Sequence, residues 1–282
     1  SPTKKQCNFD CLYCELEPAK TMDAYDDVVS VEEVTTALKS ALHEHGDVDF
    51  ITLTANGEPT LYPQLSELID EINTFKGTTK TLILSNAANI DDVKVQDALL
   101  KLDEVKLSLD CATQKCLQKL DRSHKGIDVE NIKAGMLAFK ERYNGPLVIE
   151  ILIVKTLNDS KEEISKLNEY LLKLQPTRID IGTIDRPPAF DVKPVGYEKL
   201  LEISHLFDST LPVYIASRNK VEISASSYSD EEILDTLSKR PLTAEDIEAL
   251  FDEESQNRVQ NLLRQEKIKR VSTNGVEFYK KA

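Results

Sequence analysis

Three cysteines near the start of the chain are the residues whose type and spacing most directly predict chemistry. Cys7, Cys11 and Cys14 follow the pattern C-x3-C-x2-C, and the other two of the five cysteines lie far along the chain. A loop this short can bring three sulfurs to one point, and thiolates are preferred ligands of soft metals and iron–sulfur clusters. A four-iron cluster normally takes four cysteines. Three would leave one iron open, so the loop predicts a cluster with a vacant site for a substrate.

Two other interpretations of this loop remain open. Structural zinc usually has four protein ligands, commonly two C-x2-C pairs or a mixture of Cys and His. No second pair follows the loop, and none of the four histidines has the spacing of a metal ligand. A disulfide within the loop would leave one thiol over. Zinc and a disulfide therefore explain the spacing less fully than a cluster does.

The cysteine loop resembles the signature of the radical S-adenosylmethionine (radical SAM) superfamily, and a second motif strengthens the resemblance. Tyr13 occupies the position where that family places an aromatic residue beside the bound adenine. The segment Gly57-Glu58-Pro59 resembles the family's Gly-Glu-Pro motif, which lies after the second barrel strand near the methionine amino group. The two motifs occur in the expected order, and the resemblance covers roughly residues 1–215.

The resemblance implies a [4Fe–4S] cluster held by Cys7, Cys11 and Cys14, with S-adenosylmethionine chelated at the open iron. Reductive cleavage would give methionine and a 5′-deoxyadenosyl radical that abstracts hydrogen from a substrate, with a flavodoxin- or ferredoxin-type protein as electron donor. Glu58 and the Gly57 backbone would hold the methionine amino group. Three residues at or after strand ends are candidates for contacts with the ribose and carboxylate, their alternative being ordinary loop chemistry: Asn86, Ser108 and Arg122.

Alternating strand and helix patterns after the loop must position these residues. Strands are predicted at 50–54, 81–84, 104–110, 147–154, 178–185 and 212–216, and helices at 31–44, 65–75, 92–101, 113–120, 129–143, 161–174 and 196–207. This alternation predicts parallel strands joined by right-handed crossovers. The resemblance implies a strand ahead of the loop, for which the six preceding residues leave little room. We therefore predict an α/β fold in which residues 1–220 form a partial (β/α)6 barrel without its first strand.

Polar side chains on three predicted strands suggest a ligand chamber inside this barrel. In the strand 104–110, Val105 and Leu107 alternate with polar residues, so the apolar face should pack on the helices and the polar face should line the lumen. The alternatives are an edge strand with one solvated face and, for the carboxylate in strand 147–154, a structural ion pair. The candidate substrate-contacting residues are Lys106, Asp110, Glu150, Asp180 and Arg186.

The sequence changes character after about residue 220. Residues 226–282 predict three helices, at 231–237, 244–251 and 255–266, and a hairpin around Asn274-Gly275, an arrangement that resembles a winged helix–turn–helix. The first half of this module is acidic and the second half basic. A nucleic-acid face is one interpretation; a solvated face and a protein-binding module are the others. The candidate basic patch comprises Arg258, Arg264, Lys267, Lys269 and Arg270.

Composition limits the class of protein. The chain has 282 residues, 40% of them hydrophobic, and a net charge of −14, which disfavours attraction of nucleic acid to the whole surface. No apolar run approaches the length of a membrane span and no signal peptide is evident, so we expect a cytoplasmic protein without a membrane partner. The clustered cysteines indicate a reducing compartment. For Cys111 and Cys116 we expect structural or incidental thiols, with a second cluster or a resolving thiol as alternatives.

Three classes of function follow. The first is a radical SAM enzyme that acts on tRNA, because Arg186-Pro187-Pro188 resembles a feature of the wyosine-base tRNA enzymes and the predicted hairpin is basic. The second is a radical SAM enzyme that acts on a peptide or protein, since winged-helix folds also recognise peptides. The third is a non-enzymatic iron–sulfur DNA-binding regulator, which would need neither Glu58 nor a barrel.

Overall fold

A six-stranded parallel sheet forms the framework of the larger part of the molecule. The computed structural model describes residues 4–46, 48–215, 225–273 and 275–282. The sheet has the order β1-β2-β3-β4-β5-β6, and all neighbouring strands are parallel. Its strands are β1 Phe50–Leu53, β2 Lys80–Ser85, β3 Glu104–Ser108, β4 Leu147–Ile153, β5 Arg178–Thr183 and β6 Val213–Ile215. This sheet confirms the predicted α/β fold.

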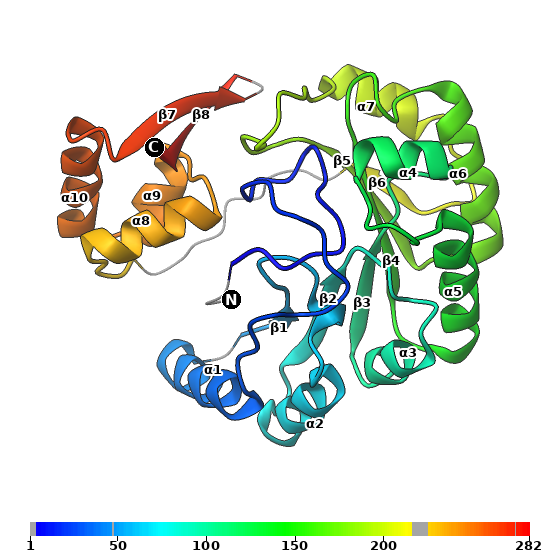
Figure 1. Cartoon of the computed structure of the whole chain (residues 1–282), viewed down its shortest axis with the longest axis horizontal. Helices are drawn as coiled ribbons and strands as arrows, with labels where there is room; N and C mark the ends of the chain where they lie inside the picture. Colours follow the sequence, from blue (N-terminus) through cyan, green and yellow to red (C-terminus); the bar gives the residue numbers. More distant parts are fainter. Residues whose placement is uncertain (1–3, 47, 216–224, 274) are drawn as a thin grey trace.

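The helices between the strands cover the outer side of the curved sheet, while the N-terminal loop and the C-terminal helices lie toward its open side (Figure 1). Polar side chains begin several of these helices; the hydroxyl of Ser30, for example, accepts a hydrogen bond from the Glu33 amide and so completes a capping box. The helices are α1 Val31–His45, α2 Leu65–Phe75, α3 Val93–Leu99, α4 Gln114–Leu120, α5 Val129–Arg142, α6 Lys161–Leu174 and α7 Tyr197–Ser204, with a 3-10 turn η1 at Pro59–Leu61.

The alternation of apolar and polar residues along the strands decides which side faces the helices. Val105 and Leu107 of β3 are fully buried and pair in register with Leu147 and Ile149 of β4, and all four belong to one apolar core. Burying each such side chain contributes on the order of 2 kcal/mol. Because successive side chains of a strand point to opposite faces, the polar residues of β3 face the concave side.

The residues ahead of the cysteine loop run beside the end of β1. Gln6 forms an isolated parallel bridge with Gly57. Its amide donates to the Asn56 carbonyl at 2.8 Å, and its carbonyl accepts from the Glu58 amide at 3.0 Å. The described residues thus contain six parallel strands without a further strand ahead of the loop.

The C-terminal residues form three helices and an antiparallel hairpin, as predicted: α8 Asp230–Lys239, α9 Ala244–Leu250, α10 Glu253–Arg264, β7 Ile268–Thr273 and β8 Val276–Lys281. They enclose an apolar core of their own, to which Ile233, Leu237 and Phe251 belong. The predicted boundary between residues 220 and 226 falls mostly outside the described residues, as does Asn274 of the predicted turn. Within the described residues, no helix is long and apolar enough to cross a membrane.

Candidate active site

The cysteine loop is held against the segment that follows β3. The amides of Asp10 and Leu12 donate to the carbonyls of Asp121 and Leu120 at 3.0 and 2.9 Å. The Tyr13 phenol donates a hydrogen bond to Oδ2 of Asp110. The loop is therefore joined to both ends of the segment 110–121, which connects the carboxyl end of β3 to the end of α4.

Gly57 allows the chain ahead of the loop to approach β1. Its φ angle is +142°, and a Cβ atom at this position would lie 1.8 Å from the carbonyl oxygen of Gln6. Only glycine fits such a backbone contact, in a conformation that L-residues rarely adopt. The glycine of the Gly-Glu-Pro segment thus has a structural role in placing the cysteine loop.

The three loop cysteines line one cavity of about 240 Å³, together with Tyr13 and Glu58. Burial raises the pKa of the Cys7 thiol to about 12, and burial likewise raises the pKa of Cys11 and of Cys14. Partly buried thiols with a raised pKa become thiolates beside a strong positive charge, such as bound iron. Three convergent sulfurs and no other cysteine in the lining fit a cluster with three thiolate ligands.

Glu58 is fully buried in the cavity wall and is oriented by four donors. Its Oε1 accepts from the Thr60 amide at 2.9 Å and from the hydroxyls of Thr60 and Ser85 at 2.7 Å each. Its Oε2 accepts from the Asn86 amide at 2.8 Å. Burial raises the pKa of Glu58, although these hydrogen bonds oppose the shift. A buried carboxylate with fixed oxygens and remaining acceptor capacity can bind a cationic group.

Asn86 connects the end of β2 to the cysteine loop. Its Nδ2 donates to Oδ1 of Asn8 at 2.7 Å and lies 3.6 Å from Sγ of Cys7. Asn8 is itself 2% exposed and donates to Asn89 at 3.2 Å. Asn86 therefore lies where it can orient both the loop and a ligand in the cavity.

Three charged side chains from neighbouring strands form ion pairs on the concave face of the sheet. Nζ of Lys106 lies 2.7 Å from Oε1 of Glu150 and 3.1 Å from Oδ2 of Asp180. Burial alone would lower the pKa of Lys106, but Glu150 and Asp180 outweigh it and raise the pKa. The ion pair that we considered for Glu150 is confirmed. Lys106 and Glu150 also line the cysteine cavity, together with Ser108.

Four predicted residues lie outside the lining of this cavity. Asp110 is 5% exposed and accepts from Tyr13 and from the Leu152 amide at 2.7 Å, so its carboxylate fixes the loop and does not face an open lumen as we expected. Asp180 lies beyond Lys106, as described above. The other two are Arg122 and Arg186.

The two arginines have distinct surroundings near the loop. Arg122 has a φ angle of +49°, pairs with Asp10 at 3.4 Å and stacks 4.8 Å above the Phe190 ring. Arg186 pairs with Glu15 at 3.5 Å and donates to the Pro241 carbonyl at 2.6 Å, so it joins the C-terminal module to the residue after Cys14.

Sequence reasoning missed several residues that hold the site together. Lys5 pairs with Asp10 at 2.8 Å beneath the loop. Asn158 is fully buried; it donates to the carbonyls of Asp110 and Leu152 at 2.9 Å and accepts from the Val154 amide at 2.7 Å. Their only signal was a polar side chain beside a motif or after a strand, which is common in loops.

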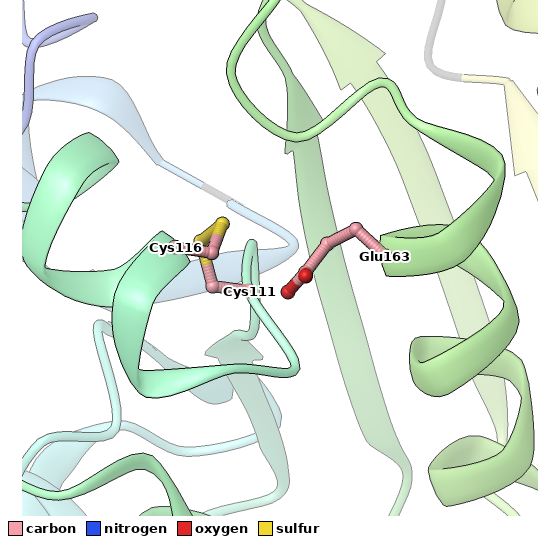
Figure 2. Close-up of side chains that lie close together, drawn as sticks. All are labelled: Cys111, Cys116 and Glu163. Carbon is pink, nitrogen blue, oxygen red and sulfur yellow. A yellow bond between two sulfur atoms is a disulfide. The ribbon is translucent and has the colours of Figure 1, made fainter.

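Cys111 and Cys116 form a disulfide, which corrects our expectation of structural or incidental thiols. The carboxylate of Glu163, at the start of α6, points toward the two cysteines (Figure 2). The three side chains are buried, and their ligand-type atoms all lie within 4.8 Å of one another. The spacing C-x4-C alone did not predict the bond, because the pairing depends on how α4 begins.

Comparison with known proteins indicates the family to which the chain belongs. The family model of the radical SAM superfamily matches residues 2–167. The chain is 37% identical to a UPF0026 protein of Helicobacter pylori over 99% of this chain and 91% of that protein, and 26% identical to a UPF0026 protein of Methanocaldococcus jannaschii over 98% and 89%.

Solved structures agree in fold. A radical SAM methyltransferase from Sphaerobacter thermophilus matches with a TM-score of 0.57 and 14% identity, over 75% of this chain and 63% of that one. The hydrogenase maturase HydG from Carboxydothermus hydrogenoformans matches with a TM-score of 0.51 and 14% identity, over 88% and 55%. Members of the superfamily use a [4Fe–4S] cluster and S-adenosylmethionine and need an electron donor. The chain is thus similar over almost its whole length to these two UPF0026 proteins; it belongs to the radical SAM superfamily and is an enzyme that uses these two cofactors.

Proposed function

We propose that Cys7, Cys11 and Cys14 hold the cluster and that S-adenosylmethionine binds in the same cavity. The observation that carries this proposal is the convergence of three partly buried thiols with the buried Glu58 around one cavity. Once bound and reduced, the two cofactors supply a 5′-deoxyadenosyl radical. The protein supplies the ligands, orients the cofactor and keeps water from the reactive carbon.

The cavity wall suggests how the cofactor is oriented. Glu58, with one oxygen that accepts a single protein hydrogen bond, would bind the methionine amino group beside the Gly57 backbone. Asn86 and Ser108, which line the cavity, would contact the ribose. Arg122 lies outside the lining, 48% exposed and next to Asp10, and would bind the carboxylate only from the rim. Tyr13 would lie beside the adenine.

Substrate would enter on the side of the cavity that carries Lys106 and Glu150. The Glu150 side chain is 45% exposed and has Lys106 as its ion-pair partner, so it retains acceptor capacity. If substrate takes the place of Lys106 at Glu150, the ion pair with Asp180 would keep Lys106 in position. The reducing partner would be a flavodoxin- or ferredoxin-type protein.

We further propose that the enzyme is of the wyosine-type tRNA kind, and a basic groove supports the proposal of a nucleic-acid substrate. The groove, of about 720 Å³, lies between residues 187–194 and the hairpin β7–β8. Four lysines line it, of which the last pairs with Glu17 at 3.5 Å, and the carboxylate of Asp191 also lies in the lining: Lys155, Lys193, Lys269 and Lys280. The amide of Ala189 in its wall donates to the Cys14 carbonyl at 2.8 Å, so the groove adjoins the cysteine loop.

The groove includes one residue of the basic patch predicted from the sequence, Lys269, and its other lysines lie outside that patch. Arg258 is paired with Glu254 of the same helix at 2.7 Å, and Arg270 with Glu277 of the partner strand in the hairpin at 3.5 Å, so two of the five candidate residues are neutralised within the C-terminal module. Lys269 faces the groove. Three of the groove lysines, at positions 155, 193 and 269, are exposed. A positively charged groove that follows a phosphate backbone is typical of single-strand binding.

Two experiments test the proposal. Anaerobically reconstituted protein should cleave S-adenosylmethionine to 5′-deoxyadenosine when reduced, and Cys11→Ala should abolish cleavage. Zinc uptake without iron would refute the cluster assignment.

Binding of labelled single-stranded RNA should weaken as salt rises. In the triple variant Lys155→Ala, Lys193→Ala, Lys269→Ala, the slope of log K against log salt should shrink by about 2. The control replaces Lys94, Lys119 and Lys161, which are exposed outside the groove; equal binding by both variants, or preference for an acidic peptide, would refute a nucleic-acid groove.

A further inference from the structure

The disulfide between Cys111 and Cys116 closes a short segment next to the cysteine loop. Cys111 directly follows Asp110 beyond the end of β3, and Cys116 lies in the first turn of α4. Their Cα atoms are 5.5 Å apart, well within the range of about 4.4–6.8 Å that a disulfide needs. The bond can therefore form and break without a large backbone movement.

The residues on either side of this bond are the ones that hold the cysteine loop. Before it, Asp110 accepts the hydrogen bond from Tyr13. After it, α4 ends at the carbonyls of Leu120 and Asp121, which accept from the loop amides at 2.9 and 3.0 Å. The disulfide thus fixes the start of α4 to the end of β3, between two attachments of one loop.

Glu163 holds this segment from the other side. Its Oε1 accepts from the amides of Ala112 and Thr113 at 2.6 and 2.9 Å, and its Oε2 accepts from the Thr113 hydroxyl at 3.0 Å. Its carboxylate oxygen lies within 4.8 Å of both sulfurs (Figure 2). A fixed carboxylate at this distance can accept a proton from a thiol through a small rearrangement.

We propose that Cys111 and Cys116 form a reversible redox site, with Glu163 as its proton acceptor, and that the oxidised state stiffens the loop that carries Cys7, Cys11 and Cys14. The role of this loop in holding a cluster rests on the proposed function; the redox site and its effect on the loop amides do not.

The exchange partner is a thiol or disulfide from solution. Cys116 is the more exposed of the two residues, at 7% against 1%, so exchange begins at its sulfur. In reduction, the thiolate of one glutathione attacks that sulfur, the S–S bond breaks, and Cys111 leaves and is protonated. A second glutathione thiolate then attacks the glutathione sulfur of the mixed disulfide, so Cys116 leaves and is protonated and oxidised glutathione is released. In oxidation the same steps run in reverse: Glu163 accepts the proton of the first protein thiol, the two thiolates displace the two halves of oxidised glutathione in turn, and the two glutathione molecules released take up the two protons.

The redox state is measured directly on the reconstituted full chain, kept anaerobic in buffers of reduced and oxidised glutathione. Thiols are trapped by alkylation and the protein is digested with trypsin. Cleavage after Lys115 leaves the two cysteines on separate peptides, which stay joined only through the disulfide. We expect a reversible transition between linked and alkylated peptides as the buffer is varied. Peptides that stay fully alkylated, or fully linked, across the whole range would refute the site.

Hydrogen exchange tests the effect on the loop. Reduction should speed exchange of the amides of Asp10 and Leu12 at least about fivefold, since these donate to the end of α4. Amides of the hairpin β7–β8 should be unaffected. Cys116→Ser and Cys111→Ser should show the fast exchange in either buffer. If one variant does not fold, the other provides the same test. Equal exchange in oxidised and reduced wild type would refute the coupling. Neither measurement depends on cleavage of S-adenosylmethionine, so failure here is distinct from failure of the proposed function.

Discussion

Oε2 of Glu58 accepts a hydrogen bond from the backbone N–H of Asn86 at 2.8 Å, which joins the turn after β1 to the end of β2. The same carboxylate binds Thr60 and Ser85 through its other oxygen. Glu58 therefore holds the cavity wall in place and presents its carboxyl group to the cavity. Both roles bear on what a substitution would do.

Glu58→Gln should weaken binding of S-adenosylmethionine at least about tenfold, a loss of about 1.4 kcal/mol. The amide oxygen can replace Oε1, but the amide nitrogen would face the Asn86 N–H, donor against donor. Isothermal titration of the reconstituted protein measures the affinity, and iron content should stay unchanged. Glu67→Gln on the exposed face of α2 makes the same charge change and should bind normally. Normal binding by the Glu58 variant would exclude its role toward the amino group.

Gly57→Ala should prevent the residues ahead of Cys7 from reaching β1. The added methyl group would lie 1.8 Å from the Gln6 carbonyl oxygen, so the two segments must separate. We expect lower iron retention and faster exchange of the Glu58 amide, which donates to Gln6. Gly196→Ala is the control, because nothing lies within 4 Å of that position. Equal iron content in the two variants would contradict this role.

Lys106→Met should uncouple substrate turnover from cofactor cleavage. The variant keeps a side chain of similar length but leaves Glu150 and Asp180 without their common cation. Turnover of substrate should fall at least about a hundredfold, or about 2.7 kcal/mol of transition-state stabilisation. Reductive cleavage of S-adenosylmethionine without substrate should persist, which distinguishes this outcome from collapse of the site. Lys94→Met, on the exposed start of α3, should behave as wild type.

Stability of the metal-free protein should fall as pH rises from about 4 to about 7. Burial raises the pKa of Asp110 from 3.8 to about 7, so the folded state keeps a proton that the unfolded state releases. Unfolding free energy then declines with pH, by at most about 1.4 kcal/mol per pH unit for one proton. Urea denaturation at several pH values measures the slope. Asp110→Asn should have a shallower slope, whereas parallel curves would show that another group is responsible.

The order of strands and helices was predictable from sequence because local periodicity determines it. Val105 and Leu107, alternating with Lys106, identified both a strand and its buried face, and the burial of each agrees. The cysteine spacing and the Gly57-Glu58-Pro59 segment likewise pointed to one chemistry, because metal ligands and tight turns restrict residue type over a few positions. What is local in the chain was visible in the sequence.

Contacts between distant segments needed the tertiary structure. Asp110 was expected in the lumen, yet its carboxylate binds Tyr13 and a β4 amide, because the cysteine loop folds back over the end of β3. Cys111 and Cys116 meet only because α4 begins where it does, and Glu163 reaches them from α6. The lysines of the groove come from loops and a hairpin far apart in sequence. Neither residue spacing nor composition predicts which strand ends become neighbours, because the packing of the helices on the sheet determines their arrangement.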